Sequence, residues 1–273
     1  MTLLKYIYYF FYDLLIIIRN LKKDKNFIIL IPRIFSNFLK FTLIYDKINN
    51  NIFFQHIRNK YDLITVHEIF GEESYNLKKY QVWEEVEKKF NKILIEKRVP
   101  LIIDCGSNIC SSTEYFCRVF KNIFPILIEP NSNSSSFGRK NLNVKNFMLI
   151  NSPISSEKKI VKFDDTLDDN RASKISEIKG TEISTITVNE ILNEHNTKIP
   201  FIIKIDIEGY EDDLFKSNYE WLDSFKIIII EIHDWMRPRE AVSFNLFKAI
   251  NSFRKKRDVI ISGENLIFVK TND

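Results

Sequence analysis

The sequence contains few cysteines and little net charge, and both features narrow the class of protein. Of the 273 residues only three are cysteines, all between Cys105 and Cys117, so a disulfide framework is excluded and a reducing compartment, the cytoplasm, is expected. The net charge of +4 is too small to indicate a nucleic-acid partner. Hydrophobic residues make up 45% and charged residues 28% of the chain, which excludes a wholly disordered protein.

No apolar run in the sequence reaches the roughly 20 residues that a membrane-spanning helix needs. The candidate segment, residues 3–18, contains Lys5 and Asp13, and no small-residue cleavage site follows it. Residues 1–25 are therefore expected to form an amphipathic helix that packs on the body of the protein. The alternative is peripheral contact with a membrane, with the tyrosines at headgroup level. The basic residues expected on the water side of such a helix are Lys22, Lys23 and Lys25.

The pattern of apolar residues changes near residue 98. Residues 1–98 contain long stretches without glycine and predict an N-terminal helical region. Residues 99–273 contain short apolar runs rich in β-branched residues, with helical patterns between several of them, and predict a doubly wound α/β domain with a parallel sheet. Runs at 159–163 and 182–187 predict an inserted hairpin, with a polar loop at 164–176 between them. The predicted sheet strands are residues 100–105, 126–129, 146–150, 201–207, 227–232, 259–261 and 266–269.

Acidic residues end the first two predicted strands of this domain, where ligands of open parallel sheets bind. Asp104 ends the first strand, and Gly106 supplies a turn that lets the backbone approach a ligand. Glu129 ends the second strand, close to the spacing at which such an acid reaches ribose hydroxyls. A dinucleotide fingerprint is absent, and Asp104 would repel a pyrophosphate but attract an ammonium or a sulfonium. The two acids indicate S-adenosylmethionine; the alternative is that Asp104 caps the following helix and Glu129 is solvated.

Five short motifs carry a resemblance to a known family. They are Ile-Asp-Cys-Gly-Ser-Asn-Ile at 103–109, Ile-Glu-Pro at 128–130, Ile-Thr-Val-Asn-Glu-Ile-Leu at 186–192, Ile-Lys-Ile-Asp-Ile-Glu-Gly-Tyr-Glu at 203–211 and Glu-Ile-His at 231–233. With these motifs the chain resembles the FkbM family of S-adenosylmethionine-dependent O-methyltransferases. The resemblance implies a class I methyltransferase (Rossmann-like) fold with a mostly parallel, seven-stranded sheet in residues 99–273. It also implies methyl transfer to a hydroxyl, often on a sugar or a sugar-bearing product.

The resemblance also implies a set of cofactor-binding residues around the first turn. The family usually has alanine and glycine where this chain has Ser107 and Cys110. A side chain at Cys110 is expected to narrow the space for the methionine part of the cofactor. Ser111 is an alternative to Ser112 as the hydroxyl at the helix start. The expected cofactor-binding residues are Asp104, Gly106, Ser107, Asn108, Ser112 and Glu129.

The fourth and fifth strands of such a fold are neighbours, so their ends bring further polar residues together. Lys204 and Asp206 share one face of their strand, as do Glu231 and His233 on theirs. Several close carboxylates need compensation from Lys204, a protonated His233 or a divalent cation, and no metal is assigned. An alcohol needs help to lose its proton, and His233, Asp206 and Glu208 all stay open as the base. The expected catalytic residues are Lys204, Asp206, Glu208 and His233; a structural ion-pair network is the alternative.

The sequence therefore predicts a cytoplasmic or membrane-associated O-methyltransferase. Its acceptor is expected to be a small molecule, a saccharide or a glycosylated intermediate, and Trp235 is a candidate to stack on a sugar face. A non-catalytic binding module that keeps the fold is one rival, favoured by Cys110. A nicotinamide-dependent oxidoreductase is the other, and the missing glycines argue against it. The oligomeric state is not indicated.

Overall fold

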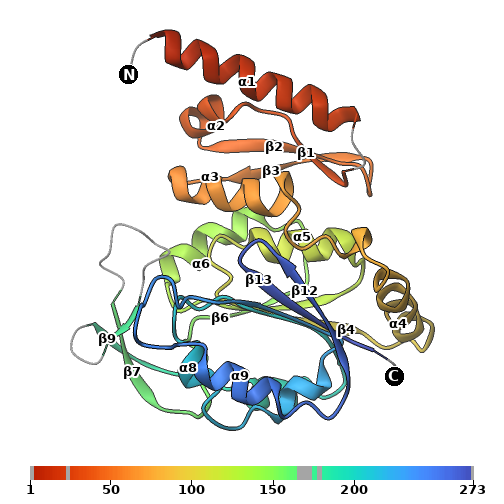
Figure 1. Cartoon of the computed structure of the whole chain (residues 1–273), viewed down its shortest axis with the longest axis vertical. Helices are drawn as coiled ribbons and strands as arrows, with labels where there is room; N and C mark the ends of the chain where they lie inside the picture. Colours follow the sequence, from red (N-terminus) through yellow and green to blue (C-terminus); the bar gives the residue numbers. More distant parts are fainter. Residues whose placement is uncertain (1–2, 23–24, 165–173, 177–179, 272–273) are drawn as a thin grey trace.

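A seven-stranded sheet forms the centre of the C-terminal two thirds of the chain in the computed structural model, which describes residues 3–22, 25–164, 174–176 and 180–271 (Figure 1). The strand order is β12-β13-β11-β10-β4-β5-β6, and among these strands β13 alone runs against the others. This order and single reversed strand define the predicted class I methyltransferase fold. The strands are β4 Pro100–Cys105, β5 Phe124–Ile128, β6 Met148–Ile150, β10 Ile199–Ile205, β11 Ile227–Glu231, β12 Arg257–Ser262 and β13 Asn265–Lys270.

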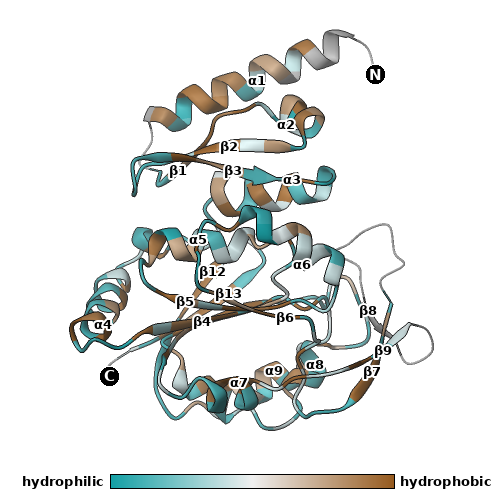
Figure 2. Ribbon diagram, turned by 180° about the vertical axis from the view of Figure 1, so that it is seen from behind, coloured by the Kyte–Doolittle hydropathy of each residue, from teal (hydrophilic) through white to brown (hydrophobic). Residues whose placement is uncertain are grey.

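The sheet is buried on both faces because its strands are apolar at almost every position. In β4, Ile102 faces one hydrophobic cluster while Leu101 and Ile103 face the other. The first cluster includes residues of α4 and α5, and the second includes residues of α7, α8 and α9, so helices cover both sides (Figure 2). The helices are α4 Trp83–Ile95, α5 Ser111–Val119, α6 Ser132–Gly138, α7 Val188–Glu194, α8 Glu211–Leu214 and α9 Phe244–Ile250, with short turns η3 Arg139–Asn141 and η4 Glu220–Ser224.

The N-terminal region contains a three-stranded antiparallel sheet, so the prediction of a purely helical region was wrong for these strands. In β2 the buried positions alternate with half-buried ones, but they include Thr42 and Asp46 besides Ile44. Buried polar residues hide the period of two that marks a strand in sequence. The elements are α1 Leu3–Lys22, β1 Phe27–Ile29, α2 Arg33–Leu39, β2 Phe41–Asp46, β3 Asn51–His56, α3 Lys60–Val66, η1 His67–Gly71 and η2 Leu77–Lys79.

The N-terminal region and the sheet domain share one hydrophobic core. Phe27 and Phe70 pack their rings against Tyr115 of α5, with ring centroids 5.3 Å and 5.9 Å away. Arg118, also on α5, pairs with the buried Asp46 at 2.9 Å. The proposed division at residue 98 therefore separates two stretches of chain whose side chains pack together. Figure 1 shows α1 at the end of the molecule farthest from the seven-stranded sheet.

The predicted inserted hairpin is confirmed. Strand β7 Ile160–Asp164 pairs antiparallel with β9 Thr181–Ser184, and β8 Lys174–Ser176 pairs with the other edge of β7. Most of the loop predicted at 164–176 lies outside the described residues.

Candidate functional site

A cavity of about 530 Å³ opens at the carboxyl ends of β4, β5, β10 and β11. This volume is within the usual range for small-molecule and cofactor sites. Thr65, Glu68 and Tyr75 of the N-terminal region also line it, so both regions shape the site. The sequence-predicted site residues that line the cavity are Gly106, Ser107, Asn108, Ser112, Glu129, Lys204, Asp206, Glu208 and His233.

Gly106 makes the tight turn after β4 and fixes the distance between two loops of the site. Its φ of +79° is in the left-handed region that favours glycine, and a Cβ there would lie 1.7 Å from the carbonyl oxygen of Asp206. The backbone N–H groups of Gly106 and Ser107 donate to the carbonyl oxygen of Ile128 at 2.9 Å and 3.2 Å. The turn therefore connects the ends of β4, β5 and β10.

Asp104 lies beneath the cavity and outside its lining. The side chain is fully buried, and its Oδ2 accepts hydrogen bonds from the hydroxyls of Ser112 and Thr113, both at 2.6 Å. Its Oδ1 lies 3.4 Å from the Nζ of Lys204. The carboxylate therefore holds side chains at the start of α5 and Lys204 without a capping hydrogen bond to the α5 backbone, and its contact with the cofactor stays a prediction.

Glu129 is the acid that faces the cavity, at the end of β5. Its Oε2 accepts from the backbone N–H of Asn108 and its Oε1 from that of Asn131, both at 2.9 Å. Burial raises the pKa of Glu129 to about 7, although both backbone hydrogen bonds act to lower it. Each carboxylate oxygen keeps a second lone pair, so the group can still accept hydrogen bonds from two ribose hydroxyls.

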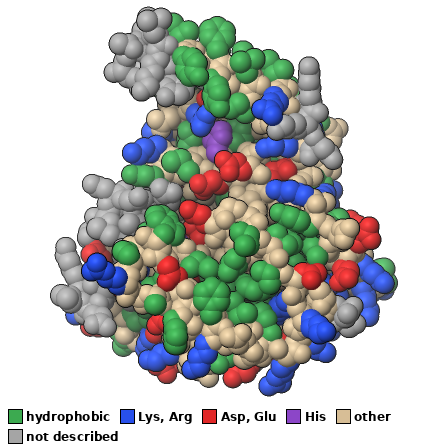
Figure 3. Space-filling view, in the orientation of Figure 1, with side chains coloured by type: hydrophobic (Ala, Val, Ile, Leu, Met, Phe, Trp, Pro, Cys, Tyr) green, Lys and Arg blue, Asp and Glu red, His purple; other side chains and the backbone are tan. Residues whose placement is uncertain are grey.

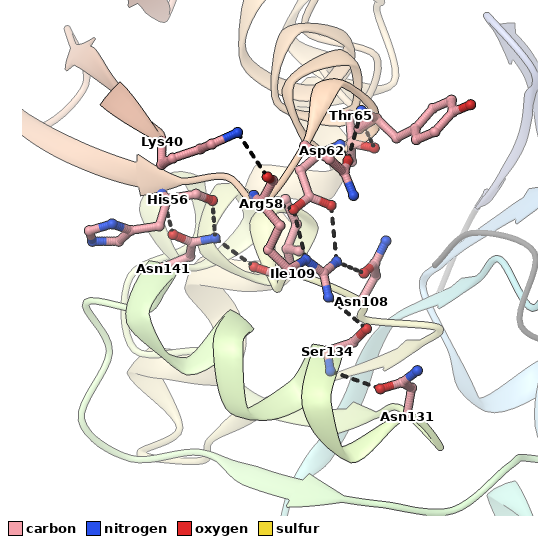
Figure 4. Close-up of polar contacts among 12 residues, drawn as sticks. Lys40, His56, Arg58, Asp62, Thr65, Asn108, Ile109, Asn131, Ser134 and Asn141 are labelled. Carbon is pink, nitrogen blue, oxygen red and sulfur yellow. Dashed lines mark hydrogen bonds and ion pairs between the residues drawn. The ribbon is translucent and has the colours of Figure 1, made fainter. Parts of the chain in front are cut away.

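An arginine of the N-terminal region supports the turn after β4, and the sequence did not predict this role. The guanidinium of Arg58 donates to the side-chain oxygen of Asn108 at 3.0 Å and to the hydroxyl of Ser134 at 2.9 Å (Figure 4). It also pairs with the buried Asp62 at 2.8 Å. Arg58 and Asn108 are 50 positions apart, and no local pattern marks their contact.

Cys110 is not among the residues that line the cavity, and the expected narrowing at this position stays a prediction. Cys110 is buried, and a Cβ added to Gly138 on α6 would lie 2.6 Å from its sulfur. Its φ of +61° explains why glycine is usual here in the family. Ser107, by contrast, lines the cavity, and its buried hydroxyl has no hydrogen-bond partner among the described residues.

The predicted catalytic residues meet around His233 on the other side of the cavity. The Nδ1 of His233 lies 2.8 Å from the Oε1 of Glu211. Its Nε2 lies 3.5 Å from a carboxylate oxygen of Asp206, 3.6 Å from one of Glu231 and 3.8 Å from one of Glu208. The structure thus gathers the expected residues and adds Glu211, the last residue of the motif at 203–211.

Two buried cations offset part of the negative charge of this cluster. Burial lowers the pKa of His233, but hydrogen bonds with Glu211 and Glu231 outweigh it and raise this pKa to about 11. Burial also opposes the charge on Lys204, yet Asp206 and Asp104 raise its pKa well above the ordinary value. His233 is therefore protonated at neutral pH in this arrangement and has no free lone pair at Nε2 to accept a proton.

Three residues of the cluster have the donor atoms of a divalent-cation site. Asp206, Glu208 and His233 each offer one ligand atom, and these atoms lie within 4.8 Å of one another. Carboxylate oxygens and imidazole are ligands that Mn²⁺ and related ions accept. A cation here would balance the carboxylates in place of the proton on His233.

The sheet order and the cavity at its carboxyl edge define this chain as a class I methyltransferase. A sequence model of the methyltransferase FkbM domain matches residues 104–259, more than half of the chain, and the chain belongs to this family. Family membership implies S-adenosylmethionine as the methyl donor.

The relatives described next share little sequence identity with this chain. The hexuronic acid methyltransferase AglP of Haloferax volcanii is 26% identical over 96 residues, a match that covers 34% of this chain and 40% of that protein. Among solved structures, a putative caffeoyl-CoA O-methyltransferase from Staphylococcus aureus aligns with a TM-score of 0.40 and 14% identity, covering 78% of this chain and 98% of that one. A precorrin-6y C5,15-methyltransferase from Geobacter metallireducens aligns with a TM-score of 0.36 and 11% identity, covering 64% and 81%.

Proposed function

We propose that this chain transfers a methyl group from S-adenosylmethionine to a hydroxyl oxygen of a saccharide or a glycosylated intermediate. The observation that carries the proposal is a single cavity with a ribose-type acid, Glu129, on one side and a cluster of carboxylates around His233 on the other. The cofactor supplies the methyl group as part of a sulfonium. The oxygen–carbon bond forms as the acceptor loses its hydroxyl proton, so the second side of the cavity has to take up that proton.

The cofactor fits the residues of the first side. Glu129 would accept the ribose hydroxyls, the turn at Gly106 would allow close approach of the backbone, and the unpartnered hydroxyl of Ser107 would bond to a polar group of the ligand. Asp104 holds the start of α5 and Arg58 holds the side chain of Asn108, so both act on the cofactor site through other residues.

The proton acceptor is Asp206 or Glu208 in this proposal. Both side chains line the cavity and are about one quarter exposed, whereas His233 is buried and protonated. His233 then holds the carboxylates in place, with Glu211 fixing the other side of its ring. Proton uptake by a positioned carboxylate contributes typically about 10²- to 10⁴-fold to a rate.

Three observations support a sugar acceptor. The relative AglP is named as a hexuronic acid methyltransferase. Trp235 lines the cavity and is 65% exposed, so its ring is free to stack on the apolar face of a sugar. The carboxylates of Glu68, Glu72 and Glu264, which also line the cavity, can accept hydrogen bonds from sugar hydroxyls.

The test is transfer of a labelled methyl group to a panel of free and lipid-linked saccharides, with a catechol as the non-sugar comparison. We expect transfer to at least one saccharide and loss of about 100-fold or more in kcat for Asp206→Asn or Glu208→Gln. Asp258→Asn, an exposed acid on β12, is the matched control and should retain full turnover. The base assignment fails if both cavity variants keep full turnover, and the acceptor class fails if the catechol alone is methylated.

A further inference from the structure

The first helix of the chain presents its apolar side to solvent. Tyr8 is 64%, Phe11 57% and Leu15 66% exposed, and Ile18 continues the same stripe at helical spacing. Figure 3 shows apolar side chains gathered at this end of the molecule. None of the helices among the described residues is long and apolar enough to cross a membrane.

A helix that packs on a protein body buries its apolar residues and exposes its charged ones, and α1 does the opposite. Asp13 is the one charged residue between Lys5 and Arg19 in the sequence, and it is buried. Its carboxylate accepts hydrogen bonds from the backbone and the guanidinium of Arg33 at 2.9 Å and 2.8 Å. The ion pair fixes the rotation of α1, and that rotation turns the apolar stripe outward.

Helix α2 enlarges this surface. Phe35 contacts Phe10 of α1 with ring centroids 5.6 Å apart and is itself half exposed. Phe38, one turn further along α2, is 82% exposed. Figure 2 shows both helices at the end of the molecule opposite the seven-stranded sheet. We call this surface the apolar end face and define it by Tyr8, Phe11, Tyr12, Leu15, Ile18, Phe35, Phe38 and Leu39.

The charge of this part of the sequence indicates what covers the face. Residues 1–45 contain seven basic residues and two acidic ones, and the pairing of Asp13 with Arg33 leaves six basic residues and one acidic residue. Arg19 is exposed on α1 itself. A basic excess beside exposed aromatic and aliphatic residues is complementary to a bilayer with anionic headgroups. A second copy of this chain would bring the same positive charge against it.

We propose that the apolar end face binds the surface of a membrane that contains anionic lipids. Phe11, Leu15 and Phe38 enter the boundary between headgroups and acyl chains, and the tyrosines lie at headgroup level. Arg19 pairs with lipid phosphates. This binding does not depend on the methyl-transfer chemistry, because the face lies outside the lining of the cavity.

The test is co-sedimentation of the full chain with vesicles of phosphatidylcholine alone or mixed with phosphatidylglycerol. We expect binding to the mixed vesicles, weaker binding to the neutral ones, and release by salt. The variant Phe11→Ser/Leu15→Ser should lower the partition coefficient by about tenfold or more, since it removes two large apolar contacts. The matched control, Ile95→Ser/Ile160→Ser, alters equally exposed apolar residues elsewhere and should bind as the wild type does.

Three results would overturn the proposal. The first is wild-type chain that stays in the supernatant with both kinds of vesicle, and the second is a Phe11→Ser/Leu15→Ser variant that binds as well as the control. The third is wild-type chain that does not bind vesicles but forms a dimer, which the same variant dissociates, because a second copy would then be the occupant of the face. Circular dichroism melts of both variants should match the wild type, since all four altered side chains are exposed.

Discussion

Replacing Glu129 by glutamine tests the proposed ribose site with the smallest change of shape. Both carboxylate oxygens accept a backbone N–H, from Asn108 and from Asn131. Glutamine keeps one acceptor and turns the other into an NH₂ donor that faces an N–H donor and the ribose hydroxyl. The mismatch with the N–H exists with and without the cofactor, so affinity falls by the lost hydrogen bond from the ribose hydroxyl to a charged acceptor, which contributes about 1–3 kcal/mol. This corresponds to a rise of roughly 5- to 150-fold in the dissociation constant of S-adenosylmethionine.

The pH dependence of binding gives a second, independent readout. The pKa of Glu129 is raised to about 7 by burial, and donors on the ribose favour the ionised form. Protonation of the free protein therefore competes with the cofactor, and affinity should fall as the pH drops through 7. In the glutamine variant this part of the pH dependence should disappear, because the side chain does not titrate.

The assay is isothermal titration calorimetry at several pH values, with thermal unfolding as the check that the variant folds. Glu84→Gln, an exposed acid on α4, is the matched control and should bind as the wild type does. The reasoning is refuted if Glu129→Gln folds and binds S-adenosylmethionine within twofold of the wild type at every pH.

Three further predictions concern the supports of the site. Gly106→Ala should abolish cofactor binding, because the new Cβ would lie 1.7 Å from a backbone oxygen. The control is Gly263→Ala, which is also at positive φ but has open space around it. This control should lose only about 1–2 kcal/mol of stability in a denaturant titration. Arg58→Ala should lower the unfolding free energy by roughly 3–5 kcal/mol, because Asp62 stays buried without its partner. The double variant Arg58→Ala/Asp62→Asn should recover part of this loss of stability. Additive losses from the two substitutions would contradict the pairing. The raised pKa of His233, about 11, means that its stabilisation is complete below its ordinary pKa of 6.5 and is lost as the pH rises towards 11. In the presence of a chelator, the wild type should therefore lose its stability advantage over His233→Gln between these values, and a constant difference would contradict the assigned charge.

The central fold could be predicted because its signal is local. The strands of the seven-stranded sheet are short, almost wholly apolar runs, and the structure places each within a few residues of its predicted bounds. The N-terminal sheet escaped prediction because Thr42 and Asp46 occupy buried positions of β2. Asp46 is tolerated there by its ion pair with Arg118, 72 positions later in the chain. An ion pair between residues so far apart cannot be predicted from the sequence around β2.

In the site too, some features follow from the local sequence and others from contacts between residues far apart in the chain. Strand ends converge in a parallel sheet, so the meeting of Asp206, Glu208 and His233 followed from alternation and strand order. The inward direction of Asp104 depends instead on the hydroxyls of α5 and on Lys204, and the role of Arg58 depends on how the N-terminal region packs. The direction in which each of these two side chains points is set by tertiary contacts, so the local sequence does not predict it.

Direct titration of the full chain with S-adenosylmethionine, S-adenosylhomocysteine and NAD tests the central claim most directly. The account predicts one-to-one binding of the first two ligands, in competition with each other, and no binding of NAD. Absence of heat with both sulfur ligands, or saturable binding of NAD alone, would contradict it.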